Sequence, residues 1–403
     1  MAVNLSEPGA LVPITGVRWA TADAAIKKPG GDDLALLVLD EGATVAGVFT
    51  RNVFAAAPVV LARRHMAATA PRALLINSGN ANAGTGRPGE ADALACCQRV
   101  ADSLGVAAEQ VLPFSTGVIG QRLPMSRIEP VITGLAEAST EDGWRSAARA
   151  IMTTDTVSKG ASRQLALDGG IVTLTGIAKG SGMIRPDMAT MLAFVATDAA
   201  VPGPDLDAAL REAVGVSFNS ITVDGDTSTN DAAMLCATGA GVALDRRRPG
   251  WTAFVDALRD LMTELACAIV RDAEGATRFI TLAVDGANSV DEARAVAFTV
   301  AHSPLFKTAA FAGDPNWGRI LAAVGRAPVA DLAIDGVAIA LDDVAIVAGG
   351  QPRPDYREAD AAEVMSRAEF TVHIGLGRGD AAATVWTSDL SYDYVRINAE
   401  YRS

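Results

Sequence analysis

One continuous segment, residues 163–197, constrains the fold of this chain more than any other. Residues 163–167 and 171–178 are joined by Asp168-Gly169-Gly170, and Asp-Gly tolerates the positive φ that a tight strand connection needs, so the pair predicts a β-hairpin. The hairpin leads into a glycine-rich loop, and residues 191–197 are again strand-like. The segment therefore predicts that Thr190 lies between a glycine-rich loop and the start of a strand.

The rest of the chain predicts strands and helices that do not alternate strictly. Short apolar runs separated by Gly, Asp and Asn indicate strands at residues 34–39, 45–49, 73–76 and 279–284. Apolar residues at helical spacing indicate helices at residues 89–104, 144–152, 204–216, 251–271 and 290–300. No internal repeat or low-complexity linker divides the chain, so this mixture favours α+β layers.

Two details of the predicted helices are specific enough to test. The helix at residues 89–104 carries four apolar residues at helical spacing, which are Leu94, Cys97, Val100 and Leu104. Ser139, with Asp142 three residues later, forms a weakened capping box that predicts the start of the helix before Trp144.

Composition bounds the class of protein. With 403 residues, of which 50% are hydrophobic, the chain can bury a large core in one large or two ordinary domains. A formal net charge of -13 argues against a nucleic-acid or anionic-membrane surface, because both attract clustered Lys and Arg. The four cysteines form no C-x-x-C pair, so reduced core residues are expected rather than disulfides or zinc ligands.

The N-terminal segment and the apolar runs bear on location. Residues 1–8 lack the basic and apolar regions of a signal peptide. Gly or a charged residue interrupts every apolar run before it reaches membrane-spanning length. We therefore expect a soluble, cytoplasmic protein without nucleic-acid or membrane partners.

Thr190 is the strongest candidate for a reactive residue. A threonine hydroxyl is a poor nucleophile unless a base removes its proton, and a backbone cut before Thr190 would supply that base as the new α-amino group. Such an amine has a pKa of about 7.7 to 8.0, so much of it is neutral near physiological pH. The alternative is an ordinary β-branched residue at the start of a buried strand.

Four sequence blocks occur in a recognisable order: STGVIG at residues 115–120, KGSGMIRPDMATML at 179–192, DAEGAT at 272–277 and YVRINAEY at 394–401. Together they resemble the bifunctional ornithine acetyltransferase (glutamate N-acetyltransferase) family of arginine biosynthesis. The resemblance implies an αββα layered sandwich of the N-terminal-nucleophile kind. It also implies self-cleavage between Ala189 and Thr190 into an α chain, residues 1–189, and a β chain, residues 190–403. By the same resemblance, these fragments would be processing products rather than independent domains, and two of each are expected to form a heterotetramer.

The resemblance assigns Thr116 and Gly117 to an oxyanion hole. Acyl transfer builds negative charge on the carbonyl oxygen, which the Thr116 hydroxyl and the Gly117 N–H would stabilise. The alternative is a plain turn that ends a strand. Lys179 is assigned to the substrate site, where it could pair with an α-carboxylate, and its alternative is a solvated loop lysine.

Further substrate contacts are implied at Thr153 or Thr154, and the sequence leaves open which of them is equivalent to the family's threonine. This block has Ser158-Lys159 where the family pattern has Pro-Lys. Glu274 matches the acid that would pair with the cationic δ-amine of ornithine, and its alternative is a helix-end glutamate facing water. Asn398 and Ser403 match the residues by which the C-terminus closes the pocket.

The reaction that the resemblance implies is ping-pong transfer of an acetyl group from N-acetylornithine to glutamate through acetyl-Thr190. No cofactor is needed. Some members of the family also accept acetyl-CoA as a co-substrate, which the sequence leaves open. Two alternatives remain: an N-terminal-nucleophile aminopeptidase, in which water accepts the acyl group, and an unprocessed metabolite-binding protein.

Other motifs in the chain do not predict a metal site. Residues 224–235 begin like a calcium loop but have Thr229 at the sixth position and Leu235 at the twelfth, so no EF-hand is predicted. The three histidines are scattered without metal-ligand spacing, which favours structural or surface roles and no metal. Residues 77–84 and 314–319 are predicted to be rigid turns that frame a site.

Overall fold

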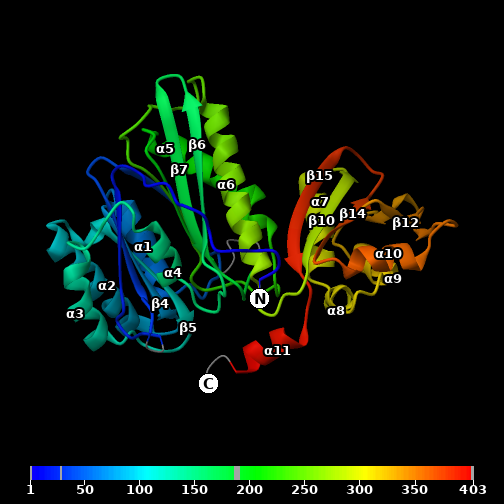
Figure 1. Ribbon diagram of the computed structural model, residues 1–403, viewed down its shortest axis with the longest axis horizontal. Coiled ribbons are helices and arrows are strands. Elements are labelled where there is room, and N and C mark those ends of the chain that lie inside the picture. Colours follow the sequence, from blue (N-terminus) through cyan, green and yellow to red (C-terminus); the bar gives the residue numbers. More distant parts are fainter. Residues whose placement is uncertain (1, 28–29, 186–190, 401–403) are drawn as a thin grey trace.

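The computed structural model describes residues 2–27, 30–185 and 191–400. Within them the chain forms three β-sheets, two in a larger N-terminal part and one in a C-terminal lobe (Figure 1). The predicted nucleophile Thr190, the cleavage-site residue Ala189 and the terminal Ser403 lie outside the described residues.

Two stacked sheets form the centre of the larger part. The four-stranded sheet has the order β1 (Val17–Ala22), β2 (Leu34–Leu39), β4 (Ala73–Asn80) and β5 (Val111–Val118). The five-stranded sheet has the order β3 (Thr44–Phe49), β9 (Ala232–Ala237), β8 (Leu192–Thr197), β7 (Gly170–Lys179) and β6 (Lys159–Leu167). Side chains from both sheets meet in one buried cluster, to which Leu37 of β2 and Phe194 of β8 belong.

Helices cover the two outer faces. Successive residues of a strand point to opposite sides of its sheet. Leu34 and Leu36 of β2 therefore face outward, where they pack with residues of α2 (Gly86–Leu104) and α3 (Met125–Leu135). On the other side, Val195 of β8 packs against α5 (Gly203–Val216) and α6 (Trp251–Arg271). This order of layers confirms the predicted α+β class and the αββα sandwich.

The C-terminal lobe has its own core around a six-stranded sheet (Figure 1). Its strand order is β13 (Gln351–Pro352), β12 (Val344–Ala348), β11 (Ala338–Leu341), β14 (Glu369–Gly375), β10 (Phe279–Ala287) and β15 (Ala381–Ser388). Its helices are α7 (Val290–Ala301), α8 (Pro304–Ala312), α9 (Trp317–Gly325) and α10 (Glu358–Ser366). The chain then leaves this lobe through α11 (Tyr392–Ala399), which has no buried side chain.

Shorter elements complete the described part of the chain. They are the helices α1 (Ala57–Ala68) and α4 (Trp144–Ala150), and the 3-10 turns η1 (Ala108–Gln110), η2 (Phe218–Ser220) and η3 (Ile334–Gly336). No helix in the described residues is long and apolar enough to cross a membrane. All four cysteines are free thiols; Cys96, Cys97 and Cys236 are buried as predicted, whereas Cys267 is only partly buried.

The predicted elements are confirmed with small shifts of their ends, but both helix details need correction. Leu94 is 41% exposed, because α2 turns this position away from the sheet that its neighbours Cys97 and Val100 cover. The capping box is wrong: Ser139 donates its hydroxyl to the carbonyl of Ala136 instead, and Gly143 occupies the N-cap of α4.

Candidate active site

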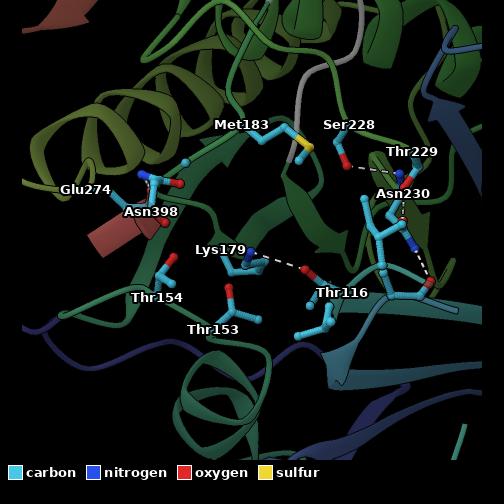
Figure 2. A pocket seen from close by; sticks show the side chains of 15 residues that line it. Thr116, Thr153, Thr154, Lys179, Met183, Ser228, Thr229, Asn230, Glu274 and Asn398 are labelled. Carbon is cyan, nitrogen blue, oxygen red and sulfur yellow. Dashed lines mark hydrogen bonds between the residues drawn. The ribbon is translucent and has the colours of Figure 1, made fainter. Parts of the chain in front are cut away.

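A cavity of about 240 Å³ lies where elements of both stacked sheets, the turn after α6 and the helix α11 come together (Figure 2). Seven of the residues predicted from the sequence line it: Thr116, Gly117, Thr153, Thr154, Lys179, Glu274 and Asn398. This volume lies below the range of about 300 to 1,000 Å³ that is usual for ligand pockets, so the cavity suits a small metabolite.

Thr116 and Gly117 lie near the end of β5, which runs parallel to β4. Gly117 has φ +132°, and a Cβ there would lie 2.3 Å from the carbonyl carbon of Gly79 on β4. Only glycine fits such a close backbone approach. The Thr116 hydroxyl is buried and accepts a hydrogen bond of 3.3 Å from the ammonium of Lys179. The pair is therefore rigid, as an oxyanion hole requires.

Lys179 is the last residue of β7 and is only 4% exposed, so it is not a solvated loop lysine. Burial lowers its pKa from the ordinary value, and nearby carboxylates oppose this shift, Asp155 first among them. The Asp155 carboxylate lies 4.0 Å from the Lys179 ammonium. A buried cation beside the Thr116 hydroxyl offers a binding point for an anion.

Thr153 and Thr154 lie on the segment between α4 and β6. The Thr154 hydroxyl shares a hydrogen bond of 2.6 Å with the Ser181 hydroxyl, while the backbone N–H of Thr153 donates to Asp155 at 3.0 Å. The departure of this block from the family pattern has a structural role. Ser158 donates to Glu7 at 2.6 Å, and Lys159 is buried between two carboxylates.

Glu274 and Asn398 face each other on the opposite wall from Thr116 (Figure 2). The Asn398 amide donates to the Glu274 carboxylate at 2.9 Å. The backbone N–H of Glu274 also donates to the Ser181 carbonyl at 2.9 Å. A Cβ at Gly182 would lie 2.4 Å from the Glu274 carboxylate, so the glycine makes room for this acid. Glu274 therefore points into the pocket rather than into water.

The turn that holds Glu274 is tied to the start of α11. Ser391, the N-cap of α11, donates its hydroxyl to the Gly275 carbonyl at 2.6 Å. A Cβ at Gly275 would lie 2.5 Å from the backbone nitrogen of Tyr394, so only glycine permits this contact. Farther along the helix, the Tyr394 hydroxyl donates to Asp224 at 3.3 Å. These bonds fix the helix that carries Asn398.

Sequence reasoning missed three polar residues of the cavity wall, Ser228, Thr229 and Asn230. The Asn230 amide donates to the carbonyl of Ala81, which follows β4, at 2.7 Å and to that of Ser115 in β5 at 2.9 Å, so it joins these two segments. The signal in the sequence is the run of short polar residues at 226–231, which overlaps the segment that begins like a calcium loop.

Of the two segments predicted to be turns that frame the site, residues 77–84 reach the cavity and residues 314–319 do not. Residues 77–80 form the end of β4 rather than a turn, and Ala81 directly after the strand lines the cavity. Residues 314–319 do not line the cavity: Asn316 caps α9 in the C-terminal lobe, where its side chain accepts from the Arg319 N–H at 3.2 Å. This block therefore forms the N-terminus of α9 rather than part of the active site.

Asp231 is a buried carboxylate beside the site, 1% exposed. One oxygen accepts from the backbone N–H of Met191 at 3.0 Å, and the other has no hydrogen-bond partner among the described residues. Burial raises the pKa of this carboxyl well above its ordinary value. Asp231 therefore bonds the residue that directly follows the predicted nucleophile Thr190 in the sequence.

The histidines have structural contacts. His65 is buried with Nδ1 2.8 Å from the Val111 carbonyl, and His302 Nε2 lies 3.0 Å from the Thr222 hydroxyl. Within residues 2–27, 30–185 and 191–400, no group of His, Cys, Asp and Glu is arranged to hold a metal ion. The site thus combines a buried cation, a half-buried anion and a constrained hydroxyl-glycine pair.

Comparison with known proteins decides the family. The model of the ArgJ family matches residues 18–403. The chain belongs to the ArgJ family. An "Arginine biosynthesis bifunctional protein ArgJ" from Methylococcus capsulatus (strain Bath) is 57% identical over 98% of this chain and 97% of its own length. A protein of the same name from Pseudomonas fluorescens is 50% identical over 100% of both chains.

A solved structure extends the comparison to three dimensions. The crystal structure of the arginine biosynthesis bifunctional protein argJ from Bacillus halodurans is 37% identical, with a TM-score of 0.50. It covers 52% of this chain and 98% of its own chain. The ArgJ family match includes residues 279–388, so the C-terminal lobe belongs to the family's chain and is not an addition to it.

Proposed function

We propose that this ArgJ-family chain transfers an acetyl group from N-acetylornithine to glutamate in arginine biosynthesis. One observation carries the proposal: Lys179, Glu274 and the Thr116-Gly117 pair line a single small cavity. A cation and an anion on its walls suit a ligand that carries both charges, as amino acids do. The names of the two curated relatives support the same pathway.

Thr190 alone can carry both the acetyl group and the proton through the reaction. The Thr190 hydroxyl attacks the acetyl carbonyl while its own α-amine takes the proton. The Thr116 hydroxyl and the Gly117 N–H stabilise the resulting oxyanion, and the C–N bond breaks as the amine returns the proton to ornithine. Glutamate then enters, its amine attacks acetyl-Thr190, and N-acetylglutamate leaves with the threonine hydroxyl restored. No cofactor takes part in these steps.

Each charged residue has a partner on the substrate. Lys179 would bind the α-carboxylate that both amino acids carry, while Glu274 would bind the δ-ammonium of ornithine. Of the two threonines, we assign the substrate contact to Thr153, because the hydroxyl of Thr154 already bonds Ser181. Asn398 orients Glu274, and Ser403 would close the pocket from the C-terminus.

A free α-amine requires self-cleavage between Ala189 and Thr190, giving residues 1–189 and 190–403, which we propose to assemble as two copies of each. The solved Bacillus halodurans chain supports two pieces, because 98% of its own length spans only 52% of this chain. We also propose a cytoplasmic location, which the four free thiols support.

The rival within the same fold is a hydrolase in which water accepts the acetyl group. Incubation of the purified protein with N-acetylornithine and glutamate separates the two. Formation of N-acetylglutamate supports the transferase, whereas release of acetate with no N-acetylglutamate would support the hydrolase. A second incubation with acetyl-CoA in place of N-acetylornithine tests whether acetyl-CoA also serves as donor.

A further inference from the structure

Behind the wall of the active-site cavity lies Asp155, a carboxylate whose side chain is 0% exposed. It does not line the cavity, yet it contacts two of the segments that do, residues 153–154 and 179–183. One oxygen accepts from the backbone N–H of Gly180 at 2.7 Å, and the other accepts from that of Thr153 at 3.0 Å. The second oxygen also lies 4.0 Å from the ammonium of Lys179.

Asp155 stays negatively charged because a second cation supports it. The buried ammonium of Lys159 donates to Asp155 at 2.7 Å and to Asp272 at 2.7 Å. Burial alone would raise the pKa of Asp155, but Lys159 and then Lys179 hold it well below its ordinary value. Burial likewise opposes the charge of Lys159, and Asp155 with Asp272 raises its pKa.

Lys179, unlike Lys159, does not have two carboxylates within hydrogen-bond distance among the described residues. Burial lowers its pKa, the cation of Lys159 adds to that effect, and the ammonium of Lys27 is a further like charge in the neighbourhood. The carboxylates of Asp155, Asp231 and Glu274 act in the opposite direction. Among the described residues, Asp155 provides the one carboxylate within ion-pair distance of Lys179.

The other two carboxylates contribute less charge at this point. Burial raises the pKa of Asp231 well above its ordinary value, which favours its neutral form. Glu274 lies on the far wall with Asn398 and would be paired with the substrate amine. The charge of Lys179 therefore depends chiefly on Asp155.

We propose that Asp155 is a positioning residue that keeps Lys179 protonated and holds the backbone at Thr153, in the pocket wall, and at Gly180, directly after Lys179. This inference rests on the proposed role of Lys179 as the partner of the substrate's α-carboxylate. Loss of Asp155 would leave the acetyl chemistry intact and weaken carboxylate binding, above all at alkaline pH.

The test compares two isosteric variants, Asp155→Asn and Asp272→Asn. Both remove one carboxylate from Lys159, but only Asp155 also lies next to Lys179, so Asp272→Asn is the matched control. The measurement is kcat and KM for N-acetylornithine between about pH 6 and pH 10, the range in which a lysine with a lowered pKa titrates. N-acetyl-1,4-diaminobutane, which lacks the α-carboxylate, serves as the comparison substrate.

For Asp155→Asn, the alkaline limb of kcat/KM for N-acetylornithine should move down by about one pH unit, the usual effect of losing an opposite charge at this distance. The change should lie mainly in KM and be absent for the diamine substrate. Asp272→Asn should keep the limb of the unmutated enzyme. An unmoved limb in Asp155→Asn, or an equal shift in both variants, would overturn the proposal.

A third variant tests the same proposal with the opposite sign, which matters if Asp155→Asn does not fold. Lys159→Met removes a like charge from the neighbourhood of Lys179. Asp155 keeps the Lys179 ammonium and the Gly180 N–H, which also favour its charged form, so the alkaline limb should move up. An unmoved or lowered limb would contradict the proposal. Calorimetric binding of ornithine to the unmutated protein checks the proposed function separately, since a failure there removes the substrate assignment itself.

Discussion

The amide of Asn398, near the end of α11, donates a hydrogen bond of 2.9 Å to the carboxylate of Glu274, on the turn that follows α6. The two residues are 124 positions apart in the chain. Between them the chain builds the whole C-terminal lobe and then returns to the cavity. The lobe thus delivers α11 to the active site.

This relationship predicts that Asn398→Ala affects binding without affecting stability. The variant loses the hydrogen bond that orients Glu274, while α11 has no buried side chain to lose. KM for N-acetylornithine should rise about tenfold, the cost of about one hydrogen bond to a charged group, with a smaller change in kcat. Val395→Ala on the same helix, at a residue 63% exposed, is the control and should leave both parameters unchanged.

Glu274→Gln should reduce kcat/KM for N-acetylornithine by about tenfold or more, because a desolvated amine loses its charged partner while the side chain keeps its shape. The half-reaction with glutamate, which has no side-chain amine, should suffer less. Steady-state kinetics with each substrate varied gives both values. A kcat/KM within a factor of about two of the unmutated enzyme, worth about 0.4 kcal/mol, would reject Glu274 as the amine's partner.

Thr116→Ala should lower kcat by about two orders of magnitude, the usual cost of one oxyanion donor. Thr116→Ser keeps a hydroxyl at the same position and should retain most of the activity. Gly117→Ala is expected to disturb the β4–β5 pair itself, since its Cβ would lie 2.3 Å from backbone. Equal kcat in Thr116→Ala and the unmutated enzyme would show that Thr116 serves the turn only.

Asp231 predicts a pH dependence of stability. Its pKa is raised in the folded state, while the unfolded chain has the ordinary value of about 3.9. Above about pH 3.9 the unfolded chain therefore releases this proton, whereas the folded protein keeps it until the pH passes the raised folded pKa. Its contribution is therefore fully present below about pH 3.9 and is lost as pH rises through the folded pKa. Two uncleaved proteins are compared, Thr190→Ala alone and Thr190→Ala with Asp231→Asn. Between about pH 4 and pH 7 the melting temperature should fall less in the protein that carries Asp231→Asn. Parallel stability curves would contradict this.

Sequence patterns predicted α+β layers because many strands and helices of the sandwich have strong local signals, whereas the αββα arrangement itself was implied by the family resemblance. Leu34 to Leu39 form a continuous apolar run, and the structure buries this strand on both faces. The C-terminal lobe was not predicted as a separate core. Its strands β11 to β13 are only 2 to 5 residues long, and β10 pairs with β14 and β15 about a hundred positions later. Such pairing leaves little trace in a local pattern.

The candidate site was predicted mainly through the family resemblance, and the structure brings seven of those residues to one cavity. The environment of Lys179 could not be predicted from its neighbours in sequence. Its burial arises from Thr116 on the other sheet and from Asp155 behind the wall. Asn230 was missed for the same reason, since its amide bonds the backbone of Ala81 and of Ser115 in β5, both far away in sequence.

The most direct test of acetyl transfer through Thr190 is the intact mass of the purified protein after mixing with N-acetylornithine alone. The account predicts two polypeptides, one of which begins at Thr190 and has 214 residues, the 403 of the chain less 189. That polypeptide should gain the mass of one acetyl group and lose it again when glutamate is added. A fully active preparation that consists of one uncut chain, or turnover with no acetylated polypeptide at any time, would contradict the account.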